Sequence, residues 1–205
     1  IFTNIVLADE LNRTTPRTQS ALLEAMQEYQ VTIERMTYPL AKPFMVIATQ
    51  VHSGGEGTYP LTDVQTDRFL LRVLSEYSSK EEEKQIITNF DQIDEPDINA
   101  VATLDEIKEL QELAKGVYVS PDIVEYTTSI VDCLRTDPDV LCGPSTRSSI
   151  ALYKCSRVLA LLDGRDFVIP DDIKYLAPLA VEHRLRVKPE AEMDDITPKI
   201  ILERA

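Results

Sequence analysis

The sequence lacks any apolar run approaching the roughly 20 residues that a membrane-spanning helix needs. It also lacks a recognisable signal peptide and an initiator methionine. We therefore expect no membrane span, and we expect the natural N-terminus to lie upstream of Ile1. A hydrophobic fraction of 43% over 205 residues is ordinary for a soluble chain with one large domain or two small ones.

Residues for a zinc site or a disulfide framework are scarce. The three cysteines, Cys133, Cys142 and Cys155, are odd in number and form no CxxC motif. The two histidines, His52 and His183, make no ligand pair with them. Reduced thiols are typical of the cytosol, so we expect a cytoplasmic protein.

Positive charge is also in short supply. The formal net charge is −14, and between Lys80 and Glu125 there are 13 acidic residues against 4 lysines, a local balance of −9. Such a surface would repel a polyanion, so a broad nucleic-acid interface is not expected. Two interpretations of the acidity remain, a solvated helical surface or an interaction face for a basic partner.

Residues 1–74 alternate between strand and helix patterns. Continuous apolar runs predict buried strands, Thr15 before Pro16 predicts a helix start, and Thr62 with Gln65 has capping-box spacing. We expect strands over Ile5–Ala8, Phe44–Thr49 and Phe69–Leu74, a helix after Pro16, a hairpin over Tyr29–Leu40 and a short helix from Thr62 to Arg68.

Residues 79–205 have the pattern of an all-α domain. Ser79 and Glu82 have capping-box spacing and open a helix over "KEEEKQIITNF". Further helices are predicted over Leu104–Lys115, Pro121–Leu134, Ser145–Leu162 and Pro170–Arg186. The predicted class is α/β, with a parallel sheet in residues 1–74 and a helical domain in residues 79–205.

Two acids, Asp9 and Glu10, follow the first predicted strand directly. Parallel sheets bind ligands beyond the carboxyl ends of their strands, and four apolar residues before Asp-Glu match the acid pair of ATPases. In that role Asp9 holds Mg²⁺ through water and Glu10 polarises the attacking water. An acidic surface turn after a strand is the competing interpretation.

Arg68 and Arg147 each have two possible interpretations as well. Arg68 is predicted at the end of a short helix, where it could form an ordinary surface ion pair with Asp67. Arg147 lies in the first turn of the helix that Ser145 caps, where a cation opposes the helix dipole. That position becomes favourable if an anion docks at the helix start.

The order of these features resembles one family. The segments concerned are "IVLADELNRTTPRTQSALLEAMQEYQVTI", "YPLAKPFMVIATQ", "EGTYPLTDVQTDRFLL" and "GPSTRSSIAL". They closely resemble the MoxR family of AAA+ ATPases over nearly the whole chain.

The resemblance implies specific roles. Asp9 and Glu10 would be the Walker B pair, Arg68 the arginine finger for a neighbouring subunit's ATP, and Arg147 sensor 2. The Tyr29–Leu40 hairpin would be the insertion that often points to a central pore. The first 74 residues would be the later part of the ATPase core, and residues 79–205 the lid.

The resemblance also implies cofactors and partners. It implies ATP and Mg²⁺, a ring, typically of six subunits, and hydrolysis that drives chaperone-like remodelling or assembly of partner proteins. Partners with a von Willebrand factor A domain are common in this family.

Two departures from the family pattern stand out. The family usually has "ATQNP" after the second strand, whose asparagine is sensor 1, whereas here Val51 and His52 follow "ATQ". Thr49 or Gln50 are the candidates to replace it. No GxxxxGK[ST] motif occurs, so we expect the phosphate loop upstream of Ile1 and no activity from these residues alone. A nucleotide-incompetent interaction module and a chelatase-type motor subunit are the alternatives.

Overall fold

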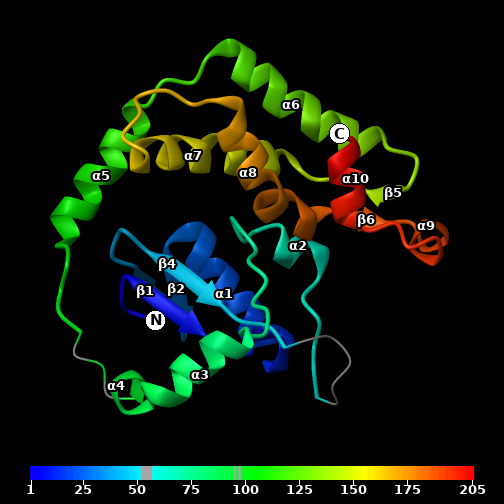
Figure 1. Cartoon of the computed structure of the whole chain (residues 1–205). Helices are drawn as coiled ribbons and strands as arrows, with labels where there is room; N and C mark the ends of the chain where they lie inside the picture. The colour runs from blue at the N-terminus through cyan, green and yellow to red at the C-terminus, as the bar shows by residue number, and fades with distance from the viewer. Residues whose placement is uncertain (52–56, 95, 97) are drawn as a thin grey trace.

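The computed structural model describes residues 1–51, 57–94, 96 and 98–205, so His52 lies outside the described residues. Figure 1 shows a mixed α/β molecule in which helices arch over a small sheet. The strands are β1 (Ile5–Ala8), β2 (Gln30–Ile33), β3 (Met36–Pro39), β4 (Met45–Ala48), β5 (Val140–Cys142) and β6 (Arg186–Val187). The predicted α/β class is confirmed.

The helices account for most of the remaining chain. The α-helices are α1 (Pro16–Glu28), α2 (Asp63–Thr66), α3 (Lys80–Thr88), α4 (Phe90–Asp94), α5 (Leu104–Gly116), α6 (Pro121–Thr136), α7 (Thr146–Leu162), α8 (Pro170–Val181), α9 (Pro189–Met193) and α10 (Pro198–Arg204). The 3-10 helices are η1 (Leu11–Arg13) and η2 (Glu182–Arg184).

Strands β1 and β4 pair in parallel, residue for residue over four positions. The prediction that both strands are buried is wrong. Alternate side chains are open to solvent, with exposed fractions of 58% for Ile5, 68% for Leu7, 51% for Met45 and 47% for Ile47. In the described chain this sheet has only two strands, and one of its faces is not covered.

Helix starts follow the capping chemistry that the sequence predicts. The Thr15 hydroxyl accepts a hydrogen bond from Thr18 N at 3.4 Å, and Pro16 takes the first helical position. At α3, Glu82 N donates to Ser79 Oγ at 3.3 Å and Ser79 N donates to Glu82 Oε2 at 2.7 Å. These bonds satisfy amide groups that a helix start otherwise leaves unpaired.

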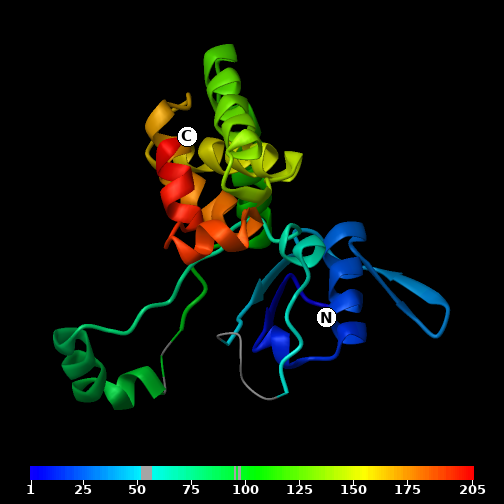
Figure 2. The same cartoon turned by 90° about the vertical axis from the view of Figure 1, so that its right-hand side faces the viewer.

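Strands β2 and β3 form the predicted hairpin, with Ile33 opposite Met36. The two turn residues, Glu34 and Arg35, have positive φ values of 50° and 68°. Such a pair matches the right-handed twist of the flanking strands. Figure 2 shows the hairpin, in blue, projecting away from α1.

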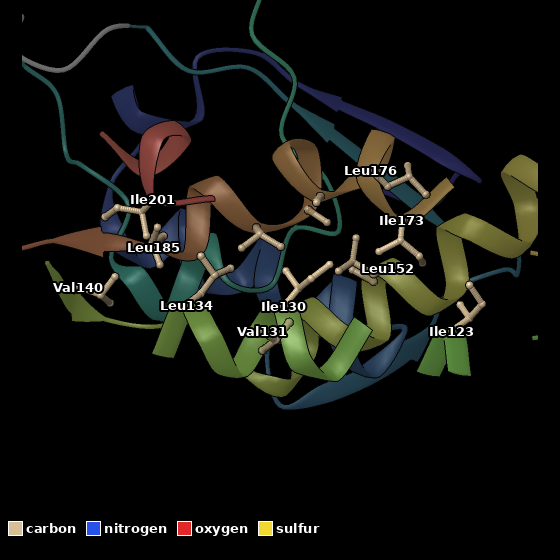
Figure 3. Close-up of a cluster of buried hydrophobic side chains, with 14 of the residues drawn as sticks. Ile123, Ile130, Val131, Leu134, Val140, Leu152, Ile173, Leu176, Leu185 and Ile201 are labelled. Carbon is tan, nitrogen blue, oxygen red and sulfur yellow. The ribbon is translucent and has the colours of Figure 1, made fainter. Parts of the chain in front are cut away.

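The main apolar core lies among the helices after Gly116 (Figure 3). Its fully buried members come from α6, α7, α8 and α10 and include Val131, Leu134, Leu152, Ile173 and Ile201. Burying one such side chain contributes about 1.5–3 kcal/mol. Within the described ranges, none of the helices combines the length and apolar character that crossing a membrane requires.

The helical half differs from the prediction at its end. The helix predicted over Pro170–Arg186 stops at Val181, and η2 follows. Arg186 belongs instead to β6, which pairs antiparallel with β5. Neither this ribbon nor the short helices α9 and α10 were predicted from the sequence.

The strand predicted over Phe69–Leu74 is wrong, because the segment is irregular. Its carbonyl groups accept hydrogen bonds from side chains rather than from a neighbouring strand. Phe69 O accepts from Arg184 Nη2 at 2.7 Å and lies 3.1 Å from His183 Nε2. The apolar pattern of this segment predicted a strand, but nothing in it indicated these side-chain partners.

Helices α3 and α4 stand apart from the other elements (Figure 2). Neither contains a buried residue in the described chain. The acidic first turn of α3, Glu81 to Glu83, is exposed. Of the two interpretations of the acidic stretch, this favours a solvated helical surface.

Candidate functional site

The acid pair lies where β1 ends, beside the end of β4. Thr49 N donates to Ala8 O at 3.0 Å and so continues the parallel pairing past both strands. The Thr49 hydroxyl donates to Asp9 Oδ1 at 2.5 Å and accepts from Glu10 N at 2.8 Å. The Thr49 side chain, just past β4, therefore holds the Asp9 carboxylate and the Glu10 backbone, and the structure brings these three predicted site residues together.

Glu10 has a left-handed backbone, with φ 47° and ψ 51°. This conformation costs a non-glycine residue about 1–2 kcal/mol, and such strain concentrates at functional sites. The bonds from Glu10 N to the Thr49 hydroxyl and from Leu11 N to Thr49 O, at 2.9 Å, hold it in place. The Glu10 carboxylate lies 3.3 Å from Arg13 Nε and is 40% exposed. It is accessible to a water molecule from which it could accept a proton.

Asp9 fits a Mg²⁺ site completed by water and substrate phosphates better than a site made of protein ligands alone. Its side chain is exposed, and among the described residues only its Oδ1 is hydrogen-bonded, to Thr49. Carboxylate oxygens are ligands that Mg²⁺ prefers, usually with water and substrate phosphates completing the shell. The described residues contain no cluster of three or more His, Cys, Asp or Glu side chains that could hold a metal.

The start of the loop after β4 is fastened by Asn12. Its Nδ2 donates to Val51 O at 2.9 Å, and its Oδ1 accepts from Val51 N at 3.2 Å. Asn12 is buried, and both polar atoms of its side-chain amide are hydrogen-bonded to the Val51 backbone. Gln50 is exposed and has no side-chain hydrogen bond among the described residues. The role of Asn12 was not predicted, because nothing local in the sequence distinguishes it from a surface asparagine.

Gln19 is a second buried amide that the sequence analysis missed. Its Nε2 lies 3.2 Å from Thr14 O and 3.0 Å from Tyr59 O, and its Oε1 accepts from Gln65 Nε2 at 3.3 Å. These bonds join α2 to the first half of α1. They help to fix the position of Arg68, which follows α2.

Arg68 lies near the far end of α1 from the acid pair. Its Nε donates to Gln27 Oε1 at 2.7 Å and its Nη1 to Val64 O at 2.7 Å. Gln27 is eleven residues beyond Pro16 in this helix, which corresponds to about 16 Å at 1.5 Å per residue. The structure therefore does not bring Arg68 together with Asp9 and Glu10 of the same chain.

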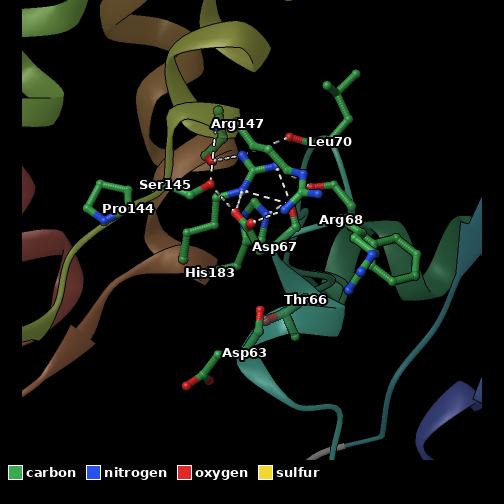
Figure 4. Close-up of polar contacts among 12 residues, drawn as sticks. Asp63, Thr66, Asp67, Arg68, Leu70, Pro144, Ser145, Arg147 and His183 are labelled. Carbon is green, nitrogen blue, oxygen red and sulfur yellow. Dashed lines mark hydrogen bonds and ion pairs between the residues drawn. The ribbon is translucent and has the colours of Figure 1, made fainter. Parts of the chain in front are cut away.

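Asp67 is the centre of a polar cluster between α2 and the helical half (Figure 4). Its carboxylate accepts from Ser145 Oγ and from Arg147 Nη1, both at 2.7 Å, and lies 3.1 Å from Arg184 Nε. The proposed surface pair of Asp67 with Arg68 does not form in this structure. Burial alone would raise the pKa of Asp67, but bonds from Ser145 and Arg147 and the charge of Arg184 hold that pKa below 3.8.

His183 and Arg184 face the same cluster, and the sequence analysis gave neither a role. The His183 ring is half-buried, and its Nδ1 has no partner among the described residues. Burial and the charge of Arg184 lower the pKa of His183 from 6.5 to about 4, while the bond to Phe69 O opposes this. Arg72 also lowers the pKa of His183, and Asp67 raises it. His183 is therefore neutral at neutral pH.

We expect the free energy of unfolding to fall as the pH drops from about 6.5 to about 4. In that window the unfolded chain takes up a proton that folded His183 does not accept, so acid favours unfolding. The loss approaches about 3 kcal/mol at most, since a tenfold difference in proton affinity is about 1.4 kcal/mol. Below about 3.8, protonation of Asp67 removes further stability. Urea unfolding of the full-length protein at pH 7.5 and 4.5 measures the first step.

His183→Gln keeps a side-chain donor but cannot titrate, so it should flatten the stability profile between pH 6.5 and 4. His52→Gln is the matched control, because His52 is the other histidine of the sequence. An unchanged profile for His183→Gln would contradict the assignment.

Two family profiles match the chain. Residues 1–71 match the ATPase family associated with various cellular activities (AAA), and residues 134–205 match the AAA lid domain. YeaC, an uncharacterised protein of Bacillus subtilis (strain 168), is 44% identical over 203 residues, which cover 98% of this chain and 63% of YeaC. Chaperone MoxR1 of Mycobacterium tuberculosis is 37% identical, over 100% of this chain and 56% of MoxR1. The chain therefore contains an AAA ATPase segment and an AAA lid segment, and it is similar to MoxR1 over its whole length.

A solved structure shares the fold of this chain. It is the crystal structure of a protein from Cytophaga hutchinsonii described as a candidate ATPase, with a TM-score of 0.91 and 35% identity over 100% of this chain and 65% of that one. The chain thus spans about three fifths of these relatives. AAA+ proteins use a nucleotide, typically with Mg²⁺, and are typically oligomeric.

Proposed function

We propose that the full-length protein hydrolyses ATP at the interfaces between subunits of a hexameric ring. The observation that carries this proposal is the Thr49 hydroxyl, which binds Asp9 Oδ1 and Glu10 N and so holds both acids at the strand ends. A fixed acid pair with a solvent-accessible glutamate is the arrangement that water activation requires. Similarity to the AAA family model and to chaperone MoxR1 supports the same activity.

In this proposal Asp9 and Glu10 have different roles. Asp9 helps to hold Mg²⁺ through water, and the bound ion neutralises phosphate charge. Glu10 accepts a proton from the attacking water. Thr49 holds the Asp9 carboxylate and the Glu10 backbone. Gln50, exposed beside it, is the remaining candidate for a phosphate contact in place of the absent sensor 1 asparagine.

The two arginines complete the proposed site. Arg68 serves the ATP of the neighbouring subunit, which its position near the far end of α1 supports. Arg147 acts as sensor 2; its side chain is 47% exposed, and a phosphate would compete with Asp67 for its guanidinium. We assign residues 1–74 to the ATPase core and residues 79–205 to the lid.

The proposed outcome of hydrolysis is chaperone-like remodelling or assembly of a protein partner in the cytoplasm. A partner with a von Willebrand factor A domain is the proposed type, and the net charge of −14 argues against a nucleic-acid substrate. The activity also needs a phosphate-binding loop, which we expect outside these 205 residues. All assays therefore use the full-length protein.

Thr49→Val tests the proposal at the residue that carries it. Valine keeps the shape of the side chain but cannot bond Asp9 or Glu10, so the acid pair loses its alignment. We expect ATP turnover to fall by about 10- to 100-fold, the usual effect of misplacing a reacting group. Phosphate release at saturating ATP measures the change, and nucleotide affinity should stay within about threefold.

Thr128→Val is the control, because in the described part of the chain this exposed threonine on α6 donates its hydroxyl only to carbonyl groups of its own helix. It should leave turnover unchanged. A wild-type protein that neither binds nor hydrolyses ATP would instead support the nucleotide-incompetent interaction module.

A further inference from the structure

The segment that carries Arg68 has little regular structure of its own. Phe69–Leu74 forms neither helix nor strand, and among the described residues the Arg68 side chain is hydrogen-bonded to Gln27 and Val64 alone. Where such a segment sits depends on what binds its backbone. Its described partners lie mostly in the corner between α8 and η2.

Arg184 is the principal partner from that corner. Its Nη2 donates to Phe69 O at 2.7 Å and to Asp67 O at 3.1 Å, and its Nε lies 3.1 Å from the Asp67 carboxylate. One planar guanidinium therefore binds the residues on both sides of Arg68. The planar guanidinium fixes the direction of these hydrogen bonds as well as their length, whereas a lysine ammonium acts as a point charge and does not fix direction.

Burial makes this attachment durable. The Arg184 side chain is 3% exposed, whereas the Arg147 side chain, which binds the same carboxylate of Asp67, is 47% exposed. Arg184 also donates to Ala180 O, so it is anchored to the last turn of α8. Arg147 can exchange Asp67 for another anion, but Arg184 has no competing partner in the described chain.

Two neighbouring contacts support the same attachment. His183 Nε2 lies 3.1 Å from Phe69 O, and Arg72 N donates to Leu179 O at 2.8 Å. The backbone on both sides of Arg68 is thus bound to the α8–η2 corner over residues 67–72. A displacement of that corner would move Arg68 with it.

We propose that Arg184 is a positioning residue for Arg68: its guanidinium fixes the backbone on both sides of Arg68, so that the α8–η2 corner sets where this arginine points. The inference rests on the proposed function, in which Arg68 acts on a neighbouring subunit's ATP. Arg184 itself touches no reacting atom. It links the position of the helical half to catalysis in the next subunit.

Arg184→Gln in the full-length protein tests this. We expect kcat for ATP to fall on the order of 100-fold, with KM within about threefold, because the variant's own acid pair is untouched. Arg184→Lys keeps the charge toward Asp67 but loses the planar guanidinium, so it should recover only part of kcat. Arg165→Gln is the matched control, since it breaks a comparable ion pair with buried Asp172 inside the helical half.

A double variant separates positioning from general damage. If Arg184 acts through Arg68, Arg68→Ala/Arg184→Gln should be no slower than Arg68→Ala alone. Hydrogen exchange gives a readout without nucleotide: the amides of Phe69 and Arg72 should exchange at least about tenfold faster in Arg184→Gln than in wild type or Arg165→Gln.

The outcomes distinguish the two proposals. If wild type turns over ATP and Arg68→Ala abolishes it, while Arg184→Gln keeps normal kcat or only raises KM, the positioning role is overturned and the ATPase stands. Additive losses in the double variant, or unchanged exchange at Phe69 and Arg72, also overturn it. Absence of turnover in wild type overturns the ATPase and, with it, this inference.

Discussion

Glu10→Gln is expected to lower ATP turnover by on the order of 10³-fold while the full-length protein still binds ATP. Glutamine has nearly the same shape as glutamate but cannot accept a proton from the attacking water, and general-base catalysis typically contributes 10²–10⁴-fold. The bonds that hold the Glu10 backbone come from its own amide and that of Leu11, both to Thr49. The substitution does not alter either amide.

Stability should hardly change in this variant. The only ion pair that Glu10 makes among the described residues is with Arg13, and both side chains are well exposed. Such pairs contribute about 0–1 kcal/mol. Single-turnover phosphate release and titration with a fluorescent ATP analogue measure turnover and affinity separately.

Arg13→Gln is the matched control for Glu10→Gln. It breaks the same ion pair but leaves the carboxylate, so turnover should stay near that of wild type. If Glu10→Gln kept more than a tenth of wild-type turnover, Glu10 could not be the general base, and the acidic surface turn would be the better interpretation of this pair.

Local features were predicted well because short-range chemistry determines them. Thr15 with Pro16 starts α1, and Ser79 with Glu82 starts α3, through bonds that span three residues. The parallel pairing of the first two predicted strands was expected as well, and the proximity of Asp9 and Thr49 is its consequence, because parallel strands bring their carboxyl ends to one edge of a sheet.

Contacts between distant segments could not be predicted in the same way. Asp67 looked like the partner of the adjacent Arg68, but its carboxylate binds Ser145 and Arg147, 78 and 80 residues away. Likewise, the apolar pattern of Phe69–Leu74 predicted a strand, whereas its carbonyls bind side chains of η2. A side chain that reaches across the molecule leaves no periodic signal in either segment.

Arg68→Ala should nearly abolish turnover in a uniform ring and still allow rescue in a mixed one. A finger acting on the neighbour's ATP is worth 10³–10⁵ in rate, and nothing in the described structure suggests that Arg68 serves its own subunit, since it contacts Gln27 and Val64 near the far end of α1. Each Arg68→Ala subunit keeps an intact acid pair but offers its neighbour no finger.

Mixing Arg68→Ala with Glu10→Gln subunits tests this geometry directly. An Arg68→Ala subunit keeps its acid pair, and a Glu10→Gln subunit keeps Arg68. Where the acid pair of the first faces Arg68 of the second, the site is complete, so equal mixing should restore a measurable fraction of turnover. Arg17→Ala, another exposed arginine of the core, should behave as wild type. If no mixing ratio restored turnover although the subunits co-assembled, Arg68 would have to act within its own chain. Because Arg68 contacts Gln27, near the end of α1 that is far from the acid pair, α2 would then have to move toward the strand ends when ATP binds.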